Sequence, residues 1–334
     1  ALYLGENSQL ILASNDNKAY SFKGDIHGSG VIDHHGEGTQ IILSSGNANV
    51  DAGSTQAGGH LVLGAKDPAS NDGISYRDLY AGDTSAPDSK ASLSLLSNTT
   101  ANTLIMDSNG KLYLGGNPNQ KAVQLVLTGN HDGVAANLAS GASLDITVNT
   151  ETITNSADNG WASIQANNGS ILINGAVPSL NVNIYGLGTA GEWSILPEFT
   201  INALYAENGL VTGNGETWTA DMVNLTYAGF ANLVYGIDKI ISEDGKLFQV
   251  HFTKLGDSPL RDFASTGNQN SAVNSLWNLT STPEKITPAM MEFLNAVGTA
   301  QAAGDTGAIQ SALSSYAGSG ITALNAAQKG ALKD

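Results

Sequence analysis

The stretch Gly38–Gly64 decides the fold, and it reads GTQIILSSGNANVDAGSTQAGGHLVLG. Its apolar residues gather in short runs, such as Ile41–Leu43 and Leu61–Leu63, and each run is closed by Gly, Ser or Asn. Short apolar runs between turn-forming residues are typical of strands that bury one face. The stretch therefore predicts short strands separated by turns.

The same pattern extends from residue 1 to about 195. Further runs are Leu2–Gly5, Leu10–Leu12, Leu112–Gly115, Leu125–Leu127, Leu144–Val148 and Ile171–Gly175. They recur about every 20 residues, as from Ile41 to Leu61 and from Leu144 to Ile164, which is typical of a solenoid of stacked coils. A β-sandwich is the alternative. The solenoid is favoured because the runs are too short, and too polar on one face, for long paired strands.

Composition limits the class of partner. Charged residues make up 13% of the 334-residue chain, and Lys and Arg number 14 against 30 Asp and Glu, which gives a net charge of -16. With no basic cluster to neutralise phosphates, the chain is not expected to bind nucleic acid or anionic membranes. Hydrophobic residues still make up 41%, which predicts a folded protein whose 39 Gly residues punctuate buried segments.

Cysteine is absent, so disulfides, thiol catalysis and Cys-ligated metals are excluded. No run of 18 apolar residues predicts a membrane-spanning helix. The chain starts at Ala1 without a Met or a signal-like segment, and we interpret it as a mature or truncated piece of a longer protein.

The segment Lys66–Ala91 interrupts the repeat with Pro, Asp, Ser and Gly, which predicts a loop. One interpretation is a plain excursion from one coil. The other is a protruding partner-binding loop, because Tyr76, Arg77 and Tyr80 are residue types that anchor interfaces. Both interpretations remain open at the level of sequence.

Residues 196–258 are rich in aromatic side chains and are expected to form a cap. Leu247–Phe252 alternates as a strand, and the Asp244–Gly245 turn predicts a hairpin with Ile237–Ile241. An open solenoid end exposes sheet edges that invite aggregation, so a closing element is expected there.

After Pro259 the pattern becomes helical. Thr287 is a predicted N-cap followed by Pro288, and a second helix is predicted to start at Asp305. A third, Ala-rich segment runs from Ile321 to Leu332. The first helix has an apolar stripe formed by Ile286, Met290, Met291, Leu294 and Val297, and the second has one formed by Ile309, Leu313 and Tyr316. We expect the second and third helices to have few tertiary contacts; a helical subdomain packed on the solenoid is the alternative.

Two segments resemble one family. Gly38–Asn49, Gly53–Thr55 and Gly58–Gly64 resemble the passenger-associated repeat of autotransporters, which has the form G-T-L-x-L-x-G-x-N, then G-x-T, then G-G-x-L-x-L-G. The preceding Gly24–Ile32 is similar to the coil that leads into that repeat. Asn268–Leu332, which includes FLNAVGTAQAAGDTGAIQSALSSY, resembles the helical region between passenger and translocator.

The resemblance implies an all-β fold, a right-handed parallel β-helix (solenoid) with a β cap and a short α-helical C-terminal tail. The implied divisions are a β-helix passenger at residues 1–195, an autochaperone-like cap at 196–258 and a helical linker toward an outer-membrane β-barrel in cis at 259–334. The implied function is that of a structural stalk at the bacterial cell surface, in adhesion or self-association. The alternative is a carrier stalk for a protease or esterase that lies upstream.

Candidate catalytic residues do not form a complete set. Gly256–Leu260 resembles the nucleophile segment of two hydrolase families, but no His follows Ser258, and Pro259 replaces the Gly of the protease pattern. A Ser nucleophile needs a base, so a turn is predicted instead. The scattered acids Asp72, Asp83, Asp88 and Asp132 are expected to be turn residues. We therefore expect no enzymatic activity from this chain.

One cluster has the residue types of a metal site. Asp33, His35 and Glu37 alternate onto one face, with His34 opposite and His27 one coil away, and zinc takes such ligands. Gly36 and Gly38 favour a solvated turn instead. The sequence also lacks the repeated G-G-x-G-x-D of calcium-binding repeats, so no metal or small-molecule cofactor is expected.

Overall fold

The short apolar runs of the sequence form short strands, and most of these strands belong to three large sheets. The computed structural model describes residues 1–14, 18–36, 38–44, 54–57, 60–67, 73–82, 92–115, 122–149, 153, 160–185, 195–227, 229–282 and 285–318. Each of the eight predicted runs quoted above lies wholly or mostly in a strand, so this prediction is confirmed.

The strands group by sheet. Sheet I contains β2 (Gln9–Ser14), β5 (Val31–Gly36), β7 (Ser54–Ala57), β10 (Asp78–Ala81), β13 (Thr103–Met106), β16 (Val134–Ala139), β19 (Ser170–Asn174) and β22 (Leu210–Thr212). Sheet II contains β3 (Ala19–Lys23), β6 (Thr39–Ser44), β8 (His60–Ala65), β11 (Ser92–Leu95), β14 (Lys111–Leu114), β17 (Ser143–Thr147), β20 (Leu180–Tyr185) and β23 (Val223–Tyr227). Sheet III contains β9 (Ile74–Ser75), β12 (Thr99–Ala101), β15 (Gln124–Leu127), β18 (Ser163–Ala166), β21 (Glu198–Ala206), β25 (Leu247–Lys254) and β24 (Tyr235–Ile241). A separate pair joins β1 (Leu2–Leu4) to β4 (Ile26–Gly28).

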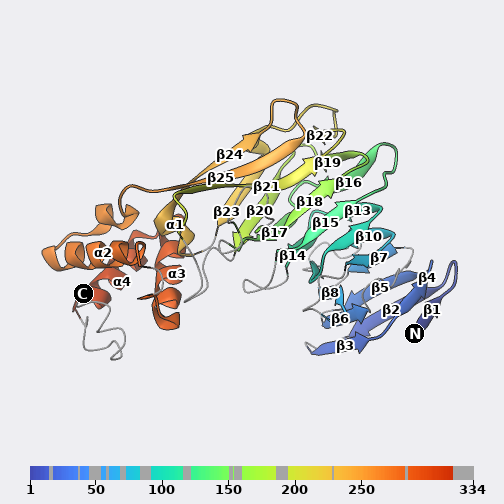
Figure 1. Cartoon of the computed structure of the whole chain (residues 1–334), viewed down its shortest axis with the longest axis horizontal. Coiled ribbons are helices and arrows are strands. Elements are labelled where there is room, and N and C mark those ends of the chain that lie inside the picture. The colour runs from blue at the N-terminus through green and yellow to red at the C-terminus, as the bar shows by residue number, and fades with distance from the viewer. Residues whose placement is uncertain are drawn as a thin grey trace.

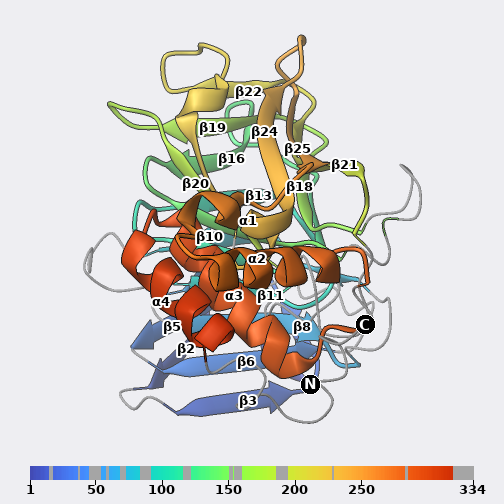
Figure 2. The same cartoon turned by 90° about the vertical axis from the view of Figure 1, so that its left-hand side faces the viewer.

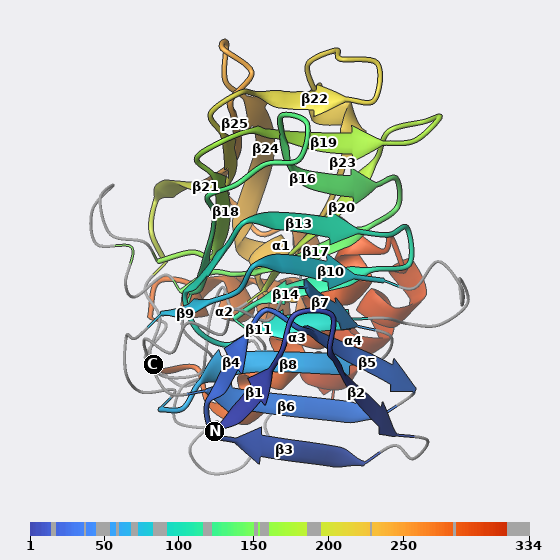
Figure 3. The ribbon, with the colours of Figure 1, turned by 90° about the vertical axis from the view of Figure 1, so that its right-hand side faces the viewer.

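From β8 to β23 the chain visits sheets II, III and I in a fixed rotation, and each strand pairs in parallel with the strand three places along the chain. Figure 1 shows the strands stacked from the N-terminal end toward the helices, and Figure 3 shows sheet I as a ladder that rises from β2 to β22. The fold is mostly β, with large parallel sheets.

The register stacks apolar side chains in columns inside the molecule. On sheet II one such column is Leu61, Leu93, Leu112, Leu144 and Val182, and all five are fully buried. These columns belong to one continuous core that extends from Leu4 in β1 to Leu313 in the last helix. Burial of such columns is the main stabilising term of the stack.

The expected repeat of about 20 residues holds only for part of the stack. Gln40 pairs with Leu61, about 20 residues away, which agrees with the expected repeat. Leu125, however, pairs with Ile164, about 40 residues away. Leu144 lies in sheet II and Ile164 in sheet III, so their spacing is a step between sheets and the expectation of one coil repeat is wrong there. The reason is that the chain passes through all three sheets before it returns to the same one, with connections of different length between the strands.

The cap hairpin is confirmed. β24 and β25 pair in antiparallel fashion, with Ile241 opposite Phe248. In the turn, Gly245 has a φ of 68°, and the Asp244 carboxylate accepts hydrogen bonds from the Ser242 hydroxyl at 2.6 Å and the Lys246 N–H at 3.2 Å. β25 also pairs in antiparallel fashion with β21, which in turn is parallel to β18, so the hairpin adds the last two strands at one end of sheet III.

In the described part of the chain, two short helices lie within residues 196–258, and four more follow them along the chain. They are η1 (Ala220–Met222), α1 (Ala231–Val234), η2 (Pro259–Phe263), α2 (Gly267–Leu279), α3 (Pro288–Ala302) and α4 (Thr306–Gly318). Both predicted caps are present, because the Thr287 hydroxyl accepts from the Met290 N–H at 3.3 Å and the Asp305 carboxylate accepts from the Ala308 N–H at 2.9 Å. Within the described residues, no helix is long and apolar enough to cross a membrane.

The tail is packed, as Figure 2 shows for α2, α3 and α4, which lie together beside α1. Ile309 and Leu313 are fully buried, the Phe293 and Tyr316 rings stack at 5.5 Å, and the Gln269 amide donates to the Ser314 hydroxyl at 2.9 Å. The expectation of few tertiary contacts is therefore wrong for α4, whose apolar stripe finds partners on α2 and α3. The predicted third helix, 321–332, lies outside the described residues.

A close backbone approach joins the tail to the cap. A Cβ added to Gly298 of α3 would lie 1.9 Å from the carbonyl oxygen of Gly229, and the Asn295 side chain accepts from the Phe230 N–H at 2.9 Å. We expect Gly298→Ala to separate α3 from α1 and to lower the free energy of local opening of the tail by about 2 kcal/mol. Hydrogen exchange of α3 and α4 measures this.

The control is Gly307→Ala in α4, where the nearest atom to an added Cβ is 3.6 Å away. This variant should leave exchange unchanged or slow it slightly, since Ala favours a helix over Gly. Equal exchange rates in the two variants would contradict tight docking of α3.

Candidate functional site

The predicted binding residues do not share one exposed loop. Residues 73–82 contain strands β9 and β10, so the loop prediction is wrong there, while 68–72 and 83–91 lie outside the described residues. Tyr76 is buried in the core with 5% of its surface exposed, whereas Arg77 is exposed and Tyr80 is half-buried. Tyr76 is therefore a packing residue, and a binding role stays a prediction for Arg77 and Tyr80.

Arg77 and Tyr80 line a groove of about 820 Å³ on the outer face of sheet I. Its floor consists of outward side chains of β10, β13 and β16, and the turn 129–133 borders it. Tyr80 and Ile105 are register partners on adjacent strands, and Ile105 is 36% exposed. Arg77 and Asn102 precede β10 and β13, so the strand register brings them to the same end of the groove.

The turn beside the groove is built by local hydrogen bonds. The Asn130 side chain accepts from the Gly133 N–H at 3.0 Å, and His131 and Val134 exchange two backbone bonds of 2.9 Å. Asp132 and Gly133 have φ values of 53° and 85°, a left-handed conformation that Asp and Gly tolerate better than most residues. The turn thereby presents His131 and Asp132, which lie 3.4 Å apart, to solvent.

Two hydrogen bonds orient polar groups of the floor. The Thr103 hydroxyl donates to the Asp78 carboxylate at 2.7 Å, and the Tyr80 hydroxyl donates to Asp107 at 2.8 Å. The Tyr80 ring is thus held beside Ile105. The groove combines an apolar strip with carboxylate, amide, hydroxyl and guanidinium groups, an arrangement typical of ligand sites.

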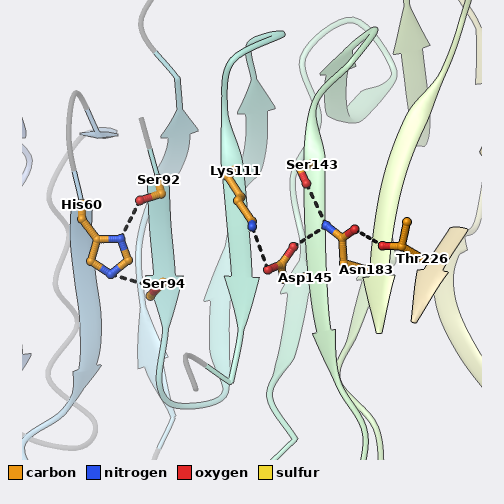
Figure 4. A network of polar contacts seen from close by, with 8 residues as sticks. All are labelled: His60, Ser92, Ser94, Lys111, Ser143, Asp145, Asn183 and Thr226. Carbon is orange, nitrogen blue, oxygen red and sulfur yellow. Dashed lines mark hydrogen bonds and ion pairs between the residues drawn. The ribbon is translucent and has the colours of Figure 1, made fainter. Parts of the chain in front are cut away.

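A second polar cluster lies on the outer face of sheet II (Figure 4). Asp145, 4% exposed, pairs with Lys111 at 3.0 Å and accepts from the Asn183 amide at 2.6 Å. Asn183 also donates to Ser143 at 3.0 Å and accepts from Thr226. At the other end, the His60 imidazole lies 2.5 Å from the Ser92 hydroxyl. Hydrogen bonds and the ion pair thus link β8 to β11 and, as a separate group, β14 to β17, β20 and β23.

Burial sets the electrostatics of this cluster. It raises the pKa of Asp145, although the hydrogen bonds from Asn183 and Lys111 oppose the shift. Burial lowers the pKa of Lys111, but the hydrogen bond and charge of Asp145 outweigh it, so that the net shift is upward. Burial also lowers the pKa of His60. The Lys111 ammonium lies 4.6 Å from the centre of the Tyr113 ring, so the cation has an aromatic neighbour as well.

Sequence reasoning missed this cluster. The run Leu144–Val148 contains Asp145 between two apolar residues, and alternation alone places it on the outer face. Its partners Lys111 and Asn183 lie on different strands more than 30 positions away, and nothing local identifies them. The cluster connects strands of the sheet, and we assign it to stability.

The other candidates have structural roles. The Ser258 hydroxyl caps η2 by accepting from the Leu260 N–H at 3.3 Å. Asp33 lies on the outer face and accepts from Gln9, whereas His34 points into the core and is fully buried, so the two lie on opposite faces. The His27 ring stacks on Tyr3 at 5.2 Å. The side chains of His35 and Glu37 lie outside the described residues, and within those residues no group of three metal-binding side chains is found.

The described residues therefore include an open groove with mixed polar and apolar groups and a partly buried set of polar contacts between strands. The groove can bind a ligand through side chains, and the polar contacts link strands. Comparison with models of known families and with curated proteins gives no match for this chain.

Proposed function

We propose that this chain is a right-handed parallel β-helix that serves as the passenger of an autotransporter. The support is the fixed rotation of strands through sheets II, III and I, since each turn of such a rotation stacks on the one before. The right hand follows from the strong preference of parallel crossover connections. The resemblance of Gly38–Gly64 to the passenger-associated repeat supports the same assignment.

One observation carries the proposal: the two ends of the stack differ. At the C-terminal end, the antiparallel hairpin β24–β25 and the aromatic residues Phe199, Tyr235 and Phe252 close the core. This suits a cap at residues 196–258 that folds early and templates the coils of residues 1–195. The helices of residues 259–334 then lead toward an outer-membrane β-barrel in cis.

At the N-terminal end, inward-facing positions are exposed. Tyr20 and Phe22 of β3 align with the core residues Leu61 and Leu63 through β6, yet they are 47% and 40% exposed. Exposed apolar side chains on an edge strand such as β3 favour pairing with another chain or another coil. This supports a stalk in adhesion or self-association at the bacterial cell surface. It equally supports the second candidate, a stalk that carries an upstream protease or esterase unit on this end.

The test is surface display in a Gram-negative host. Residues 1–334 are placed between an export signal and an autotransporter barrel, and intact cells are treated with protease. We expect cleavage of the passenger on intact cells and faster sedimentation of the culture. Replacing Tyr20 and Phe22 with Lys should abolish the faster sedimentation, because charge on an edge strand opposes pairing, and should leave display unchanged.

The matched control is Ile240→Lys, which places a charge at another exposed apolar position, on β24, 40% exposed. A passenger that stays protected from protease in intact cells would contradict the autotransporter assignment. Display without faster sedimentation would contradict self-association and favour the carrier stalk.

A further inference from the structure

We propose that the groove on sheet I binds a neutral oligosaccharide of hexopyranose units, laid across strands β10, β13 and β16. The proposal does not depend on the passenger assignment, because it concerns only the groove and its side chains. It extends the sequence-based expectation for Arg77 and Tyr80, and it removes Tyr76 from the site.

The first argument concerns backbone groups. β10 pairs with β7 and β13, β13 pairs with β10 and β16, and β16 pairs with β13 and β19. The floor therefore has no free edge to which an extended peptide could add as a strand. A ligand must therefore be recognised by the side chains of the groove. A ligand rich in hydroxyl groups can form hydrogen bonds with each polar side chain there.

The second argument concerns the side chains. Arg77 and Asn102 supply donors at one end, Asp132 and Asn130 supply an acceptor and an amide at the turn, and all four are exposed. Hydroxyl groups both donate and accept hydrogen bonds, so a sugar can pair with the donors and the acceptors of the groove. An ion of one sign can pair with only one of these two kinds of group.

The third argument concerns shape and apolar surface. The Tyr80 ring, held by its hydrogen bond to Asp107, lies next to the exposed Ile105 and forms an apolar strip among polar groups. A pyranose ring has apolar C–H faces and a polar edge, and thus matches such a strip. The volume of about 820 Å³ is within the range of ligand sites and admits a short oligosaccharide.

The fourth argument concerns charge. The lining contains one permanent cation, Arg77, and two carboxylates, Asp78 and Asp132, so the groove has no strong charge of one sign. The whole chain has a net charge of -16 and repels polyanions. A neutral sugar is thus favoured over an acidic polysaccharide or a basic peptide.

The test uses calorimetric titration of the full chain with defined probes: cellohexaose, chitohexaose, maltohexaose, mannohexaose, a galacturonic acid hexamer and hexalysine. We expect at least one of the four neutral hexamers to bind with a Kd below about 1 mM. Tyr80→Ala should weaken that binding about tenfold or more, because an aromatic side chain in contact with the ligand is lost. Arg77→Ala should weaken it as well.

The matched controls are Tyr205→Ala and Arg261→Ala. Tyr205 is a half-buried strand tyrosine whose hydroxyl donates to Glu207, as that of Tyr80 does to Asp107, but it lies on sheet III. Arg261 is exposed and pairs with Asp257 at 2.7 Å. Circular dichroism verifies that all four variants fold. Absence of binding to all four neutral hexamers, tighter binding of either charged probe, or equal effects of groove and control variants would each overturn the proposal.

Discussion

Phe252→Ala is expected to destabilise the protein by about 3–5 kcal/mol, the usual cost of truncating a buried aromatic side chain. Phe252 is fully buried, stacks on Phe199 at 4.5 Å with an interplanar angle of 6°, and meets Tyr235 edge-on at 5.9 Å. Its strand β25 pairs with both β21 and β24, so the cavity would lie at the centre of the cap. Urea unfolding followed by far-ultraviolet circular dichroism measures the loss.

The matched control is Phe22→Ala at the open end of the stack. Phe22 is 40% exposed, so its removal should cost less than about 1 kcal/mol. If the cap forms before the coils, Phe252→Ala should also slow refolding, since a mutation in the folding nucleus acts on the folding rate. Equal stability losses in the two Phe variants would contradict a closing role for the cap, and an unchanged refolding rate would contradict early folding.

Lys111→Met is expected to destabilise the protein at neutral pH by about 3 kcal/mol, because it leaves the buried Asp145 carboxylate without its cation. The matched control is Lys246→Met, which removes the partner of Glu207 at 3.2 Å. That pair is far more exposed, with side-chain exposures of 35% and 50%, and its loss should cost less than about 1 kcal/mol. Denaturant titration of both variants gives the comparison.

The pH dependence of this loss has a defined sign. The pKa of Asp145 is raised by burial, so its protonated form is favoured in the folded state; the stability that this group contributes is present at low pH and is lost as pH rises through the folded pKa. Removing the Lys111 cation raises that pKa further. The destabilisation by Lys111→Met should therefore shrink as pH falls from 7 toward 4, because protonated Asp145 needs no cation.

A double variant distinguishes the effect of the unpaired Asp145 charge from the effect of lost side-chain packing at Lys111. Lys111→Met with Asp145→Leu should recover most of the lost stability, since an apolar pair avoids the cost of a buried charge. A loss that does not change with pH, or a double variant no more stable than Lys111→Met, would show that the Asp145 charge is not the cause.

Local features of the chain could be predicted from the sequence. The Asp244–Gly245 turn and the alternation on both sides of it placed the β24–β25 hairpin, and Thr287 and Asp305 marked the starts of α3 and α4. These predictions succeed because turns and helix caps depend on hydrogen bonds between residues within about five positions of one another. The sequence predicted only part of the candidate site, since it identified Arg77 and Tyr80 as binding residues but not Asn130 and His131.

By itself, then, the sequence determined short strands with one buried face, the cap hairpin and the capped helices. Only the tertiary structure decided which strands pair, because connections of unequal length place Leu125 beside Ile164 and separate Leu144 from it. The same pairing buried Tyr76, left Tyr80 at the surface beside Ile105, and brought Lys111 to Asp145. Alternation assigns side chains to the two faces of a strand, but contact between strands depends on register, and the register of a strand inside a parallel sheet is set by its neighbours on both sides.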